Sequence, residues 1–357
     1  MSSRSAVRLA TRCTAFPTKR TVFPASHTTV RSVSKTPKRE DAAVATALEY
    51  EVPIITYKDG LREEHVVPIS EPPVVKPPGG DVRKVAYPLS AAVCDQLTPT
   101  MKKFTLNDRV AVVTGAGRGL GYNMAQALAE AGVKGIAIID MLKDEGEIAA
   151  RELAEQTGVD VRFYPVDITK ETLVHKAVED IVDHYGKIDI FINSAGIADS
   201  NMPAENYSID RFRRLMDINV NGNFIVAQAI GKEMIRTGTK GSMVFIASMS
   251  GSIVNYPQQQ NCYNASKAAV IQMCKSLAAE WAHYGIRVNT ISPGYMDTAL
   301  NRVPQLDAQK KMWVERTPQG RLGNVDELNN LAVMLASDAS SFMTGSNIII
   351  DGGYTLW

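Results

Sequence analysis

From Phe104 to the end of the chain, short apolar segments alternate with amphipathic ones, and this alternation constrains the fold more than any other feature. Each apolar segment is a continuous run, as expected of parallel strands that are covered on both faces. The segments between them have helical periodicity. The pattern predicts an α/β fold with a doubly wound parallel sheet. The seven expected strands lie within residues 109–115, 135–140, 161–167, 188–196, 241–248, 286–294 and 345–353, and helices are expected within 120–132, 147–158, 173–186, 209–235, 325–337 and around residue 263.

The sequence TGAGRGLG, residues 114–121, lies between the first expected strand and its helix. Glycines at 115, 119 and 121 let the backbone turn tightly and approach a charged ligand. The free N–H groups and the positive dipole end of the following helix suit a pyrophosphate. Because the loop also stands in a repeating βα pattern, it predicts a Rossmann-type dinucleotide site.

Two acidic residues end the second and third expected strands. Asp140 stands where an acid accepts hydrogen bonds from the adenosine ribose, and its charge would repel a 2′-phosphate, which favours NAD over NADP. Arg118 in the glycine-rich loop argues the other way, so NADP stays possible, and Asp140 could instead cap a helix. Asp167 is placed to contact the adenine amino group or to serve a turn.

In the segment NCYNASKAAV, Tyr263 and Lys267 are four residues apart within an expected helix, so both side chains share one face. A neighbouring cation favours the ionised form of a phenol. The pair can therefore act as a proton donor and acceptor near neutral pH, although an amphipathic helix with a half-buried tyrosine would look the same.

Taken together, the motifs resemble those of the short-chain dehydrogenases/reductases over residues 104–357. They occur in that family's order. They are TGAGRGLG, Asp167, NSAG at 193–196, Asn219 in MDINVNG, Ser248 in IASMSG, YNASK at 263–267, SPG at 292–294 followed by Thr298, and the closing IIIDGGY.

The resemblance implies a catalytic role for four residues. Tyr263 is expected to be the general acid/base, and Lys267 to lower its pKa and hold the nicotinamide ribose. Ser248 is expected to bind the substrate oxygen and Asn219 to position a water in a proton relay. Ser248 lies fifteen residues before Tyr263, two more than is typical of the family, so Ser250 is the alternative. NSAG in place of the usual NNAG should leave that loop intact.

The resemblance also implies which residues contact the cofactor, and it implies no metal. Ile197 and Tyr295 are expected to complete the wall beside the nicotinamide. The cofactor-binding residues are expected to be Gly115, Arg118, Gly119, Leu120, Gly121, Asp140, Asp167, Ile168, Asn193, Ala195, Gly196, Tyr263, Lys267, Pro293, Gly294 and Thr298.

Within the family, residues 248–270 and the ending DGGYTLW are similar to fungal polyol dehydrogenases and ketose reductases, including D-arabinitol dehydrogenase, sorbose reductase and mannitol dehydrogenase. The polar residues Asn255 and Gln258 to Gln260 suit a polyhydroxylated substrate or a surface loop. A polyol or ketose substrate is expected, and the resemblance implies a homotetramer. The alternatives are a broad NADPH-dependent carbonyl reductase, a 3-oxoacyl reductase, and a non-enzymatic dinucleotide sensor.

The N-terminal part differs in composition from the rest of the chain. Residues 1–40 hold nine basic residues and one acid, Glu40, with Arg4, Arg8 and Arg12 on one helical face. This composition is typical of a mitochondrial transit peptide and predicts a location in the mitochondrial matrix. The alternative is a disordered basic tail on a cytoplasmic protein. The remaining chain carries 30 basic and 37 acidic residues, which gives no indication of nucleic-acid binding.

Residues 41–103 are expected to form a proline-rich extension, with short strands possible at 50–57 and 62–69 and a linker at 71–80. No apolar run is long enough to span a membrane. The four cysteines have no metal-like spacing and are expected to be reduced thiols. The predicted domains are therefore 1–40, 41–103 and 104–357.

Overall fold

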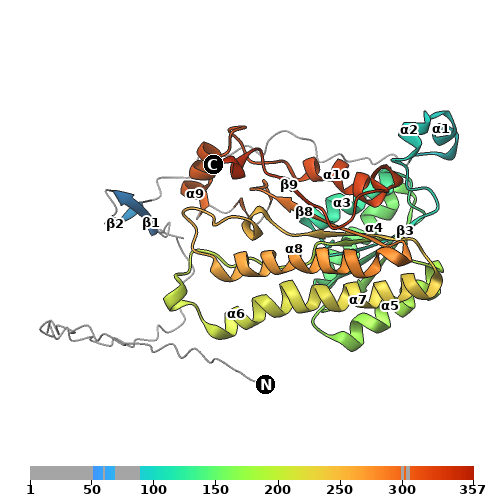
Figure 1. Ribbon diagram of the computed structural model, residues 1–357, viewed down its shortest axis with the longest axis horizontal. Coiled ribbons are helices and arrows are strands. Elements are labelled where there is room, and N and C mark those ends of the chain that lie inside the picture. Colours follow the sequence, from blue (N-terminus) through green and yellow to red (C-terminus); the bar gives the residue numbers. More distant parts are fainter. Residues whose placement is uncertain (1–50, 59–60, 69–88, 299–300, 303–305) are drawn as a thin grey trace, which may run out of the picture. The chain divides into compact units, whose positions relative to one another are not determined.

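The computed structural model describes residues 51–58, 61–68, 89–298, 301–302 and 306–357 (Figure 1). The predicted transit peptide and the linker at 71–80 lie outside the described residues.

A seven-stranded, fully parallel sheet forms the centre of the fold and confirms the predicted α/β class. Its strand order is β5-β4-β3-β6-β7-β8-β9. The order reverses direction after β5, so consecutive βα units are wound to both sides of β3. The strands are β3 Val110–Thr114, β4 Gly135–Asp140, β5 Asp160–Pro165, β6 Ile190–Asn193, β7 Ser242–Ile246, β8 Arg287–Pro293 and β9 Asn347–Ile350.

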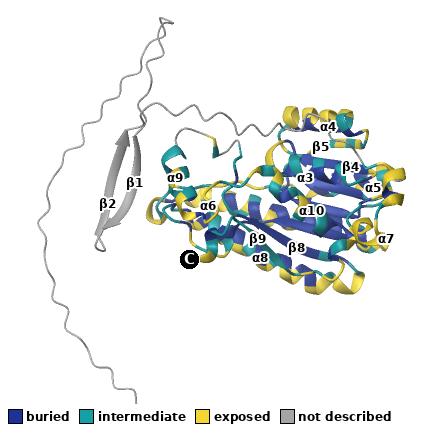
Figure 2. Cartoon of the chain, turned by 90° about the horizontal axis from the view of Figure 1, so that it is seen from above, coloured by how far each residue is buried: buried dark blue, intermediate teal, exposed yellow. Residues whose placement is uncertain are grey.

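Helices cover both faces of the sheet (Figures 1 and 2). One face packs on α3, α4 and α10, and the other on α5, α7 and α8. Within β3, Val112 belongs to one core while Ala111 and Val113 belong to the other, because successive strand residues point to opposite faces. The helices are α1 Ala91–Gln96, α2 Pro99–Lys102, α3 Gly119–Glu130, α4 Lys143–Thr157, α5 Glu171–Tyr185, α6 Ile209–Met216, α7 Asn223–Thr237, α8 Asn261–Trp281, α9 Asp307–Arg316 and α10 Asn329–Ala336.

The two edge strands depart from the predicted continuous burial. β3, β6 and β7 are buried throughout, whereas exposed and half-buried residues alternate along much of β5 and β9 is mostly half-buried. β5 and β9 lie at the two edges of the sheet. Each has a neighbouring strand on one side only, and the helices that cover the centre of the sheet extend over its edges less completely.

The helix predicted over 209–235 contains a wider turn. A π-helical segment, η2 (Asp217–Gly222), separates α6 from α7 without breaking the path of the chain. Such segments often occur at functional sites because they turn a side chain inward. Here η2 carries the buried Asn219.

The described parts of the N-terminal extension form short strands and helices. The strands β1 (Glu51–Lys58) and β2 (Leu61–Pro68) pair antiparallel, as the two short strand patterns predicted. Two short helices that the sequence did not indicate, α1 and α2, directly follow the capping residues Ser90 and Thr98. The Leu89 N–H donates to the Glu130 carbonyl at the end of α3, which attaches this segment to the sheet domain.

Among the described residues, no helix is both long and apolar enough to cross a membrane.

Candidate active site

All predicted site residues except those on α8 and η2 lie at the carboxyl end of the sheet, because the strands are parallel and their following loops leave from the same edge. Ligands of doubly wound sheets bind at this edge. These residues come from the ends of six of the seven strands, from the loops behind them and from the first turn of α3.

The glycine-rich loop after β3 approaches the loop after β6 so closely that a side chain would not fit. Gly115 has a φ of +64°, and a Cβ there would lie 2.8 Å from the backbone of Ala195. A Cβ on Gly121 would overlap the Gly115 carbonyl. By contrast, a Cβ on Gly119 would meet no atom within 4 Å, so the loop is open where α3 begins.

Asp140 fastens this loop from the neighbouring strand. Its Oδ2 accepts the Gly117 N–H at 2.9 Å and its Oδ1 accepts the Leu142 N–H at 3.1 Å. The helix-cap alternative is wrong, because α4 starts after Leu142 and has no side-chain cap. Arg118 is exposed and makes no ion pair or hydrogen bond to a described residue.

A dinucleotide fits these residues. The open face beside Gly119, the free N–H groups at the start of α3 and the carboxylate of Asp140 form a cradle for a phosphate and a ribose. Leu120 is half-buried in the first turn of α3 and packs against the core.

Thr114, whose role the sequence did not indicate, joins the first loop to the NSAG loop. Its Oγ1 donates to Asn193 Oδ1 at 2.9 Å and accepts the N–H groups of Ser194 and Ala195, both at 3.2 Å. Asn193 also donates to the Asn223 carbonyl at 3.1 Å. Because Ser194 contributes its backbone, serine at this position is compatible with the loop.

On α8, the Lys267 side chain is buried without a carboxylate partner among the described residues. Its Nζ donates to the Ile246 carbonyl at 2.9 Å and lies 5.6 Å from the centre of the Tyr263 ring. Burial lowers the pKa of Lys267 to about 8, because the charged ammonium loses hydration. Tyr263 and Lys267 therefore lie on the same face of α8, as their spacing predicted.

The prediction that the pKa of Tyr263 is lowered is wrong for the protein without bound cofactor or substrate. Burial raises the pKa of Tyr263, and a hydrogen bond with Ser248 opposes this rise without reversing it. The physical reason is that removing water from an ionised phenol costs more than one hydrogen bond returns.

Of the two serines, Ser248 is the one whose hydroxyl lowers the pKa of Tyr263, while Ser250 bonds to Ser248 and to Gln260. Ser248 precedes the turn η3 (Met249–Gly251) and its Oγ accepts the Ser250 N–H at 3.1 Å. Gly251 lets this turn pack on α8, since a Cβ there would lie 2.7 Å from the carbonyl carbon of Lys267.

Asn219 holds the loop that follows NSAG. Its Nδ2 donates to the Ile197 carbonyl at 2.8 Å and to Ser266 at 3.1 Å, and its Oδ1 accepts the Ile197 N–H at 2.8 Å. A Cβ on Gly196 would lie 3.1 Å from this Oδ1 and 3.7 Å from the Lys267 Nζ. Asn219 thus fixes the backbone beside the lysine.

Asp167 lies in a turn, and its Oδ1 accepts the N–H and hydroxyl of Thr169 at 3.0 and 2.8 Å. Desolvation raises the pKa of Asp167, but these hydrogen bonds and the charge of Lys170 outweigh it, so the net pKa is lowered. The side chain of Ile168 packs in the core, which leaves its backbone for a ligand.

The SPG loop after β8 approaches the end of β9. A Cβ on Gly294 would lie 2.7 Å from Asp351, and the Gly294 N–H donates to the Ile350 carbonyl. Pro293 ends β8. The structure does not bring the Thr298 hydroxyl to a described partner; only its backbone is bonded, to Met296 and Asn301.

Three of the four polar residues before Tyr263 are buried and bind one another, so they do not form a surface loop. Asn255, Gln258 and Gln260 are all buried. Gln260 donates to Asn255, Asn255 donates to the Tyr295 hydroxyl, and that hydroxyl bonds to Gln258. The sequence showed their polarity but not that they bind one another.

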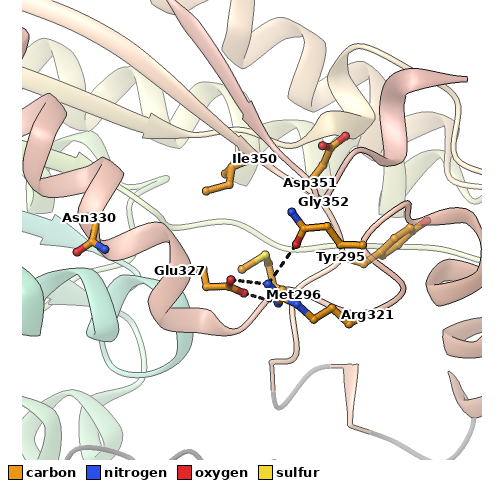
Figure 3. A pocket seen from close by; sticks show the side chains of 10 residues that line it. Tyr295, Met296, Arg321, Glu327, Asn330, Ile350, Asp351 and Gly352 are labelled. Atoms are coloured by element: carbon orange, nitrogen blue, oxygen red, sulfur yellow. Dashed lines mark hydrogen bonds and ion pairs between the residues drawn. The ribbon is translucent and has the colours of Figure 1, made fainter.

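Tyr295 connects this network to an aromatic cluster. Its ring stacks on Trp313 of α9 with 4.1 Å between ring centres, and meets Tyr354 edge-on. Tyr295 also lines a cavity of about 320 Å³ between the ends of β8 and β9 and α10, in which Arg321 and Glu327 form an ion pair (Figure 3). None of the four predicted catalytic residues lines this cavity, so the site is defined by Ser248, Tyr263 and Lys267 instead.

Comparison with known proteins identifies the family. A family model described as enoyl-(acyl carrier protein) reductase matches residues 115–355. Sorbose reductase sou1 of Schizosaccharomyces pombe is 41% identical over 252 residues, which cover 70% of this chain and 97% of the relative. The chain belongs to the short-chain dehydrogenase/reductase family.

Other members of the family are similar over the same region. The NADP-dependent mannitol dehydrogenase of Hypocrea jecorina is 40% identical, with 71% of this chain and 94% of the relative covered. The structure of an NAD⁺-bound xylitol dehydrogenase is 36% identical with a TM-score of 0.65, covering 70% of this chain and 99% of that one. This short-chain dehydrogenase/reductase is an NAD(P)-dependent oxidoreductase, similar to fungal polyol dehydrogenases.

Proposed function

We propose that the protein interconverts a polyol and its 2-ketose, oxidising a secondary hydroxyl of a pentitol or hexitol with NAD in the manner of a D-arabinitol 2-dehydrogenase. The observation that carries this proposal is the position of Tyr263, whose phenol interacts with the Ser248 hydroxyl and whose ring centre lies 5.6 Å from Lys267 Nζ. Relatives that act on sorbose, mannitol and xylitol support the substrate class.

Oxidation of a secondary alcohol requires that a proton leave oxygen while a hydride leaves carbon; NAD, when bound, accepts that hydride. Tyr263 takes the proton as general base and returns it as general acid in the reverse direction. Ser248 donates a hydrogen bond to the reacting oxygen. Lys267 holds positive charge beside the phenol, and so favours its ionised form.

The remaining predicted residues position these groups. Asn219 fixes the backbone at Gly196 and Ile197 beside Lys267. The water that Asn219 is expected to hold stays a prediction. The loop from Gly115 to Gly121 would bind the pyrophosphate, and Asp140 the adenosine ribose.

NAD is favoured in this proposal because the carboxylate of Asp140 would lie beside the adenosine ribose, where it would repel a 2′-phosphate. The exposed Arg118 is the group that could favour NADP instead. Relatives of both kinds occur, an NADP-dependent mannitol dehydrogenase and an NAD⁺-bound xylitol dehydrogenase.

The assembly and the location are also proposals. A homotetramer is supported by the family resemblance, and the exposed aromatic side chains of Phe342 and Trp357 are available for contacts between subunits. Light scattering of the purified protein would measure the assembly. The composition of residues 1–40 supports import into mitochondria, which an import assay with and without those residues would test.

The proposed activity is tested by offering the full chain arabinitol, mannitol, sorbitol and xylitol with NAD and separately with NADP, and following cofactor reduction by absorbance. Turnover of a polyol with NAD is the expected result. Turnover only with NADP would overturn the cofactor assignment. No turnover of any polyol, together with reduction of a simple ketone or an acyl thioester, would overturn the substrate class.

A further inference from the structure

We propose that Ser250 and Gln260 are positioning residues, which hold the Ser248 hydroxyl in a reversible hydrogen-bonded chain against the phenol of Tyr263. This inference rests on the proposed function of the Ser248–Tyr263–Lys267 site. It assigns a role to the second serine and to one of the polar residues that the sequence associated with the substrate.

The backbone fixes one side of Ser248. Its Oγ accepts the Ser250 N–H at 3.1 Å, which leaves the hydroxyl with one lone pair and one proton. Ser250 Oγ lies 3.0 Å from Ser248 Oγ, and Ser248 also bonds to Tyr263. Ser248 therefore has two hydroxyl neighbours and can donate to only one of them at a time.

Gln260 fixes the far end of the chain. Its Nε2 lies 3.2 Å from Ser250 Oγ, and 2.9 Å from the side-chain oxygens of both Asn255 and Asn264. The amide nitrogen can only donate, and its two N–H groups are divided among three oxygens, so Ser250 Oγ, the most distant of the three, accepts a shared hydrogen bond. Only 4% of Ser250 and 7% of Gln260 are exposed, and water does not compete freely for these bonds.

These constraints leave two arrangements of protons, one for each state of Tyr263. When the phenol is neutral it donates to Ser248, which donates to Ser250. When the phenol is ionised, Ser250 donates to Ser248, whose own proton is then available to the phenolate or, once substrate is bound, to the reacting oxygen. Both arrangements satisfy Ser248 fully. When the phenolate takes the proton of the substrate hydroxyl, the two serine hydroxyls rotate from one arrangement to the other, and neither serine gains or loses a proton. The chain therefore serves Tyr263 as acid and as base.

Both ends of this chain are attached to the helix that carries Tyr263. Gln260 immediately precedes α8, and its carbonyl accepts the Asn264 N–H at 3.0 Å. Gly251, at the other end, packs on the α8 backbone at Lys267. The distance from Ser248 to Tyr263 is thus set by packing within one small unit.

The test uses Ser250→Ala and Gln260→Glu, which remove one hydroxyl and one pair of amide donors with little change of shape. The neighbouring residues supply matched controls, Ser252→Ala and Gln259→Glu. Ser252 is exposed and Gln259 half-buried, and neither side chain bonds to a described residue. Ser250→Thr, which restores a hydroxyl, is the rescue variant.

The first measurement is the pH profile of kcat/KM for polyol oxidation. Losing a hydrogen bond that reaches the ionised phenol should make Tyr263 harder to deprotonate, and move the acidic limb upward by about one pH unit in both test variants. The controls should keep the wild-type profile, and Ser250→Thr should return toward it. A fall in kcat with an unmoved limb in both test variants would show a merely structural role and overturn the proposal.

The second measurement does not require turnover. Tyrosine labelled with ¹³C at the ζ carbon gives a Tyr263 resonance, assigned by its loss in Tyr263→Phe, which responds to hydrogen bonding of the phenol. It should move in Ser250→Ala and Gln260→Glu and not in the controls.

If the wild type oxidises no polyol but the resonance moves, the substrate proposal fails and the positioning proposal stands. If polyols are oxidised but neither the resonance nor the limb moves, the positioning proposal fails alone.

Discussion

The dinucleotide side and the hydroxyl side of the site are held in place by different interactions. On the dinucleotide side, Gly115 and Gly121 allow main-chain segments to approach closely, and Asp140 accepts two main-chain N–H groups. On the hydroxyl side, the turn at Ser248 is held by side-chain hydroxyls and amides that end at Gln260. Substitutions that add atoms should therefore disrupt the dinucleotide side. Substitutions that remove hydrogen bonds should disrupt the hydroxyl side.

The largest expected effect comes from removing the reacting group on the hydroxyl side while leaving the other side intact. Tyr263→Phe keeps the ring but loses the proton carrier, so kcat should fall by about 10³-fold or more. Binding of NAD, followed by calorimetry, should persist because the glycine-rich loop is unchanged. Tyr284→Phe, at an exposed tyrosine beyond α8, is the control. Retained turnover in Tyr263→Phe would remove Tyr263 from the reaction.

The same contrast explains which parts of the site the sequence could predict. A glycine that must adopt a positive φ is a local requirement, and the positions of Gly115 and Gly119 in a βα unit were sufficient to predict the loop. The strands were predictable for a similar reason, because burial on both faces leaves continuous apolar runs. The interruption of the long helix at η2 was not, because a wider turn has no comparable pattern.

Polar partners on the hydroxyl side depend on contacts distant in sequence. Asn255 and Gln258 would give the same sequence pattern in a surface loop, and their partner Tyr295 lies 37 residues beyond Gln258. Thr114 meets Asn193 across 79 residues. The choice between Ser248 and Ser250 likewise depended on how η3 packs on α8. Sequence spacing cannot supply such information, since it is set by the fold.

The second prediction concerns the buried charge, which belongs to the hydroxyl side alone. The pKa of Lys267 is about 8 in the folded chain and near 10.5 in the unfolded one. Between these values the unfolded chain binds more protons, so folding stability rises with pH across the window. In Lys267→Met this contribution is absent. The free energy of unfolding of the wild type, relative to that of Lys267→Met, should therefore rise by about 3 kcal/mol from pH 7 to pH 10.5.

Urea denaturation of the cofactor-free proteins at several pH values measures this difference. Lys275→Met, at an exposed position of the same helix, is the control. A Lys267→Met difference that stays constant with pH would mean that the ammonium remains well hydrated, and would contradict the burial of an unpaired cation at this position.

The third prediction adds one methyl group on the dinucleotide side. Gly115→Ala should weaken NAD binding by about 30-fold, roughly 2 kcal/mol, because the new Cβ would lie 2.8 Å from Ala195 and force the two loops apart. Gly158→Ala is a matched control, since Gly158 also has a positive φ but a Cβ there would meet nothing within 4 Å. Both variants should lose stability from backbone strain. Equal losses of NAD affinity would show that strain, rather than close approach, matters.

The smallest effect is expected where the dinucleotide side uses charge rather than space. Asp140→Ser removes the carboxylate but keeps an oxygen able to accept one of the two backbone N–H groups, so the loop should remain largely in place. Without the repulsion of a 2′-phosphate, the ratio of kcat/KM for NADP to that for NAD should rise about tenfold, which is about 1.4 kcal/mol. Asp144→Ser, in the exposed first turn of α4, removes the same charge nearby and should leave the ratio unchanged. Adding Arg118→Ala to Asp140→Ser should cancel part of the gain, because Arg118 is the exposed cation in the loop. If Asp140→Ser instead lowers the affinity for both cofactors equally, the carboxylate acts only by fastening the loop, and the dinucleotide side discriminates between the two cofactors by other means.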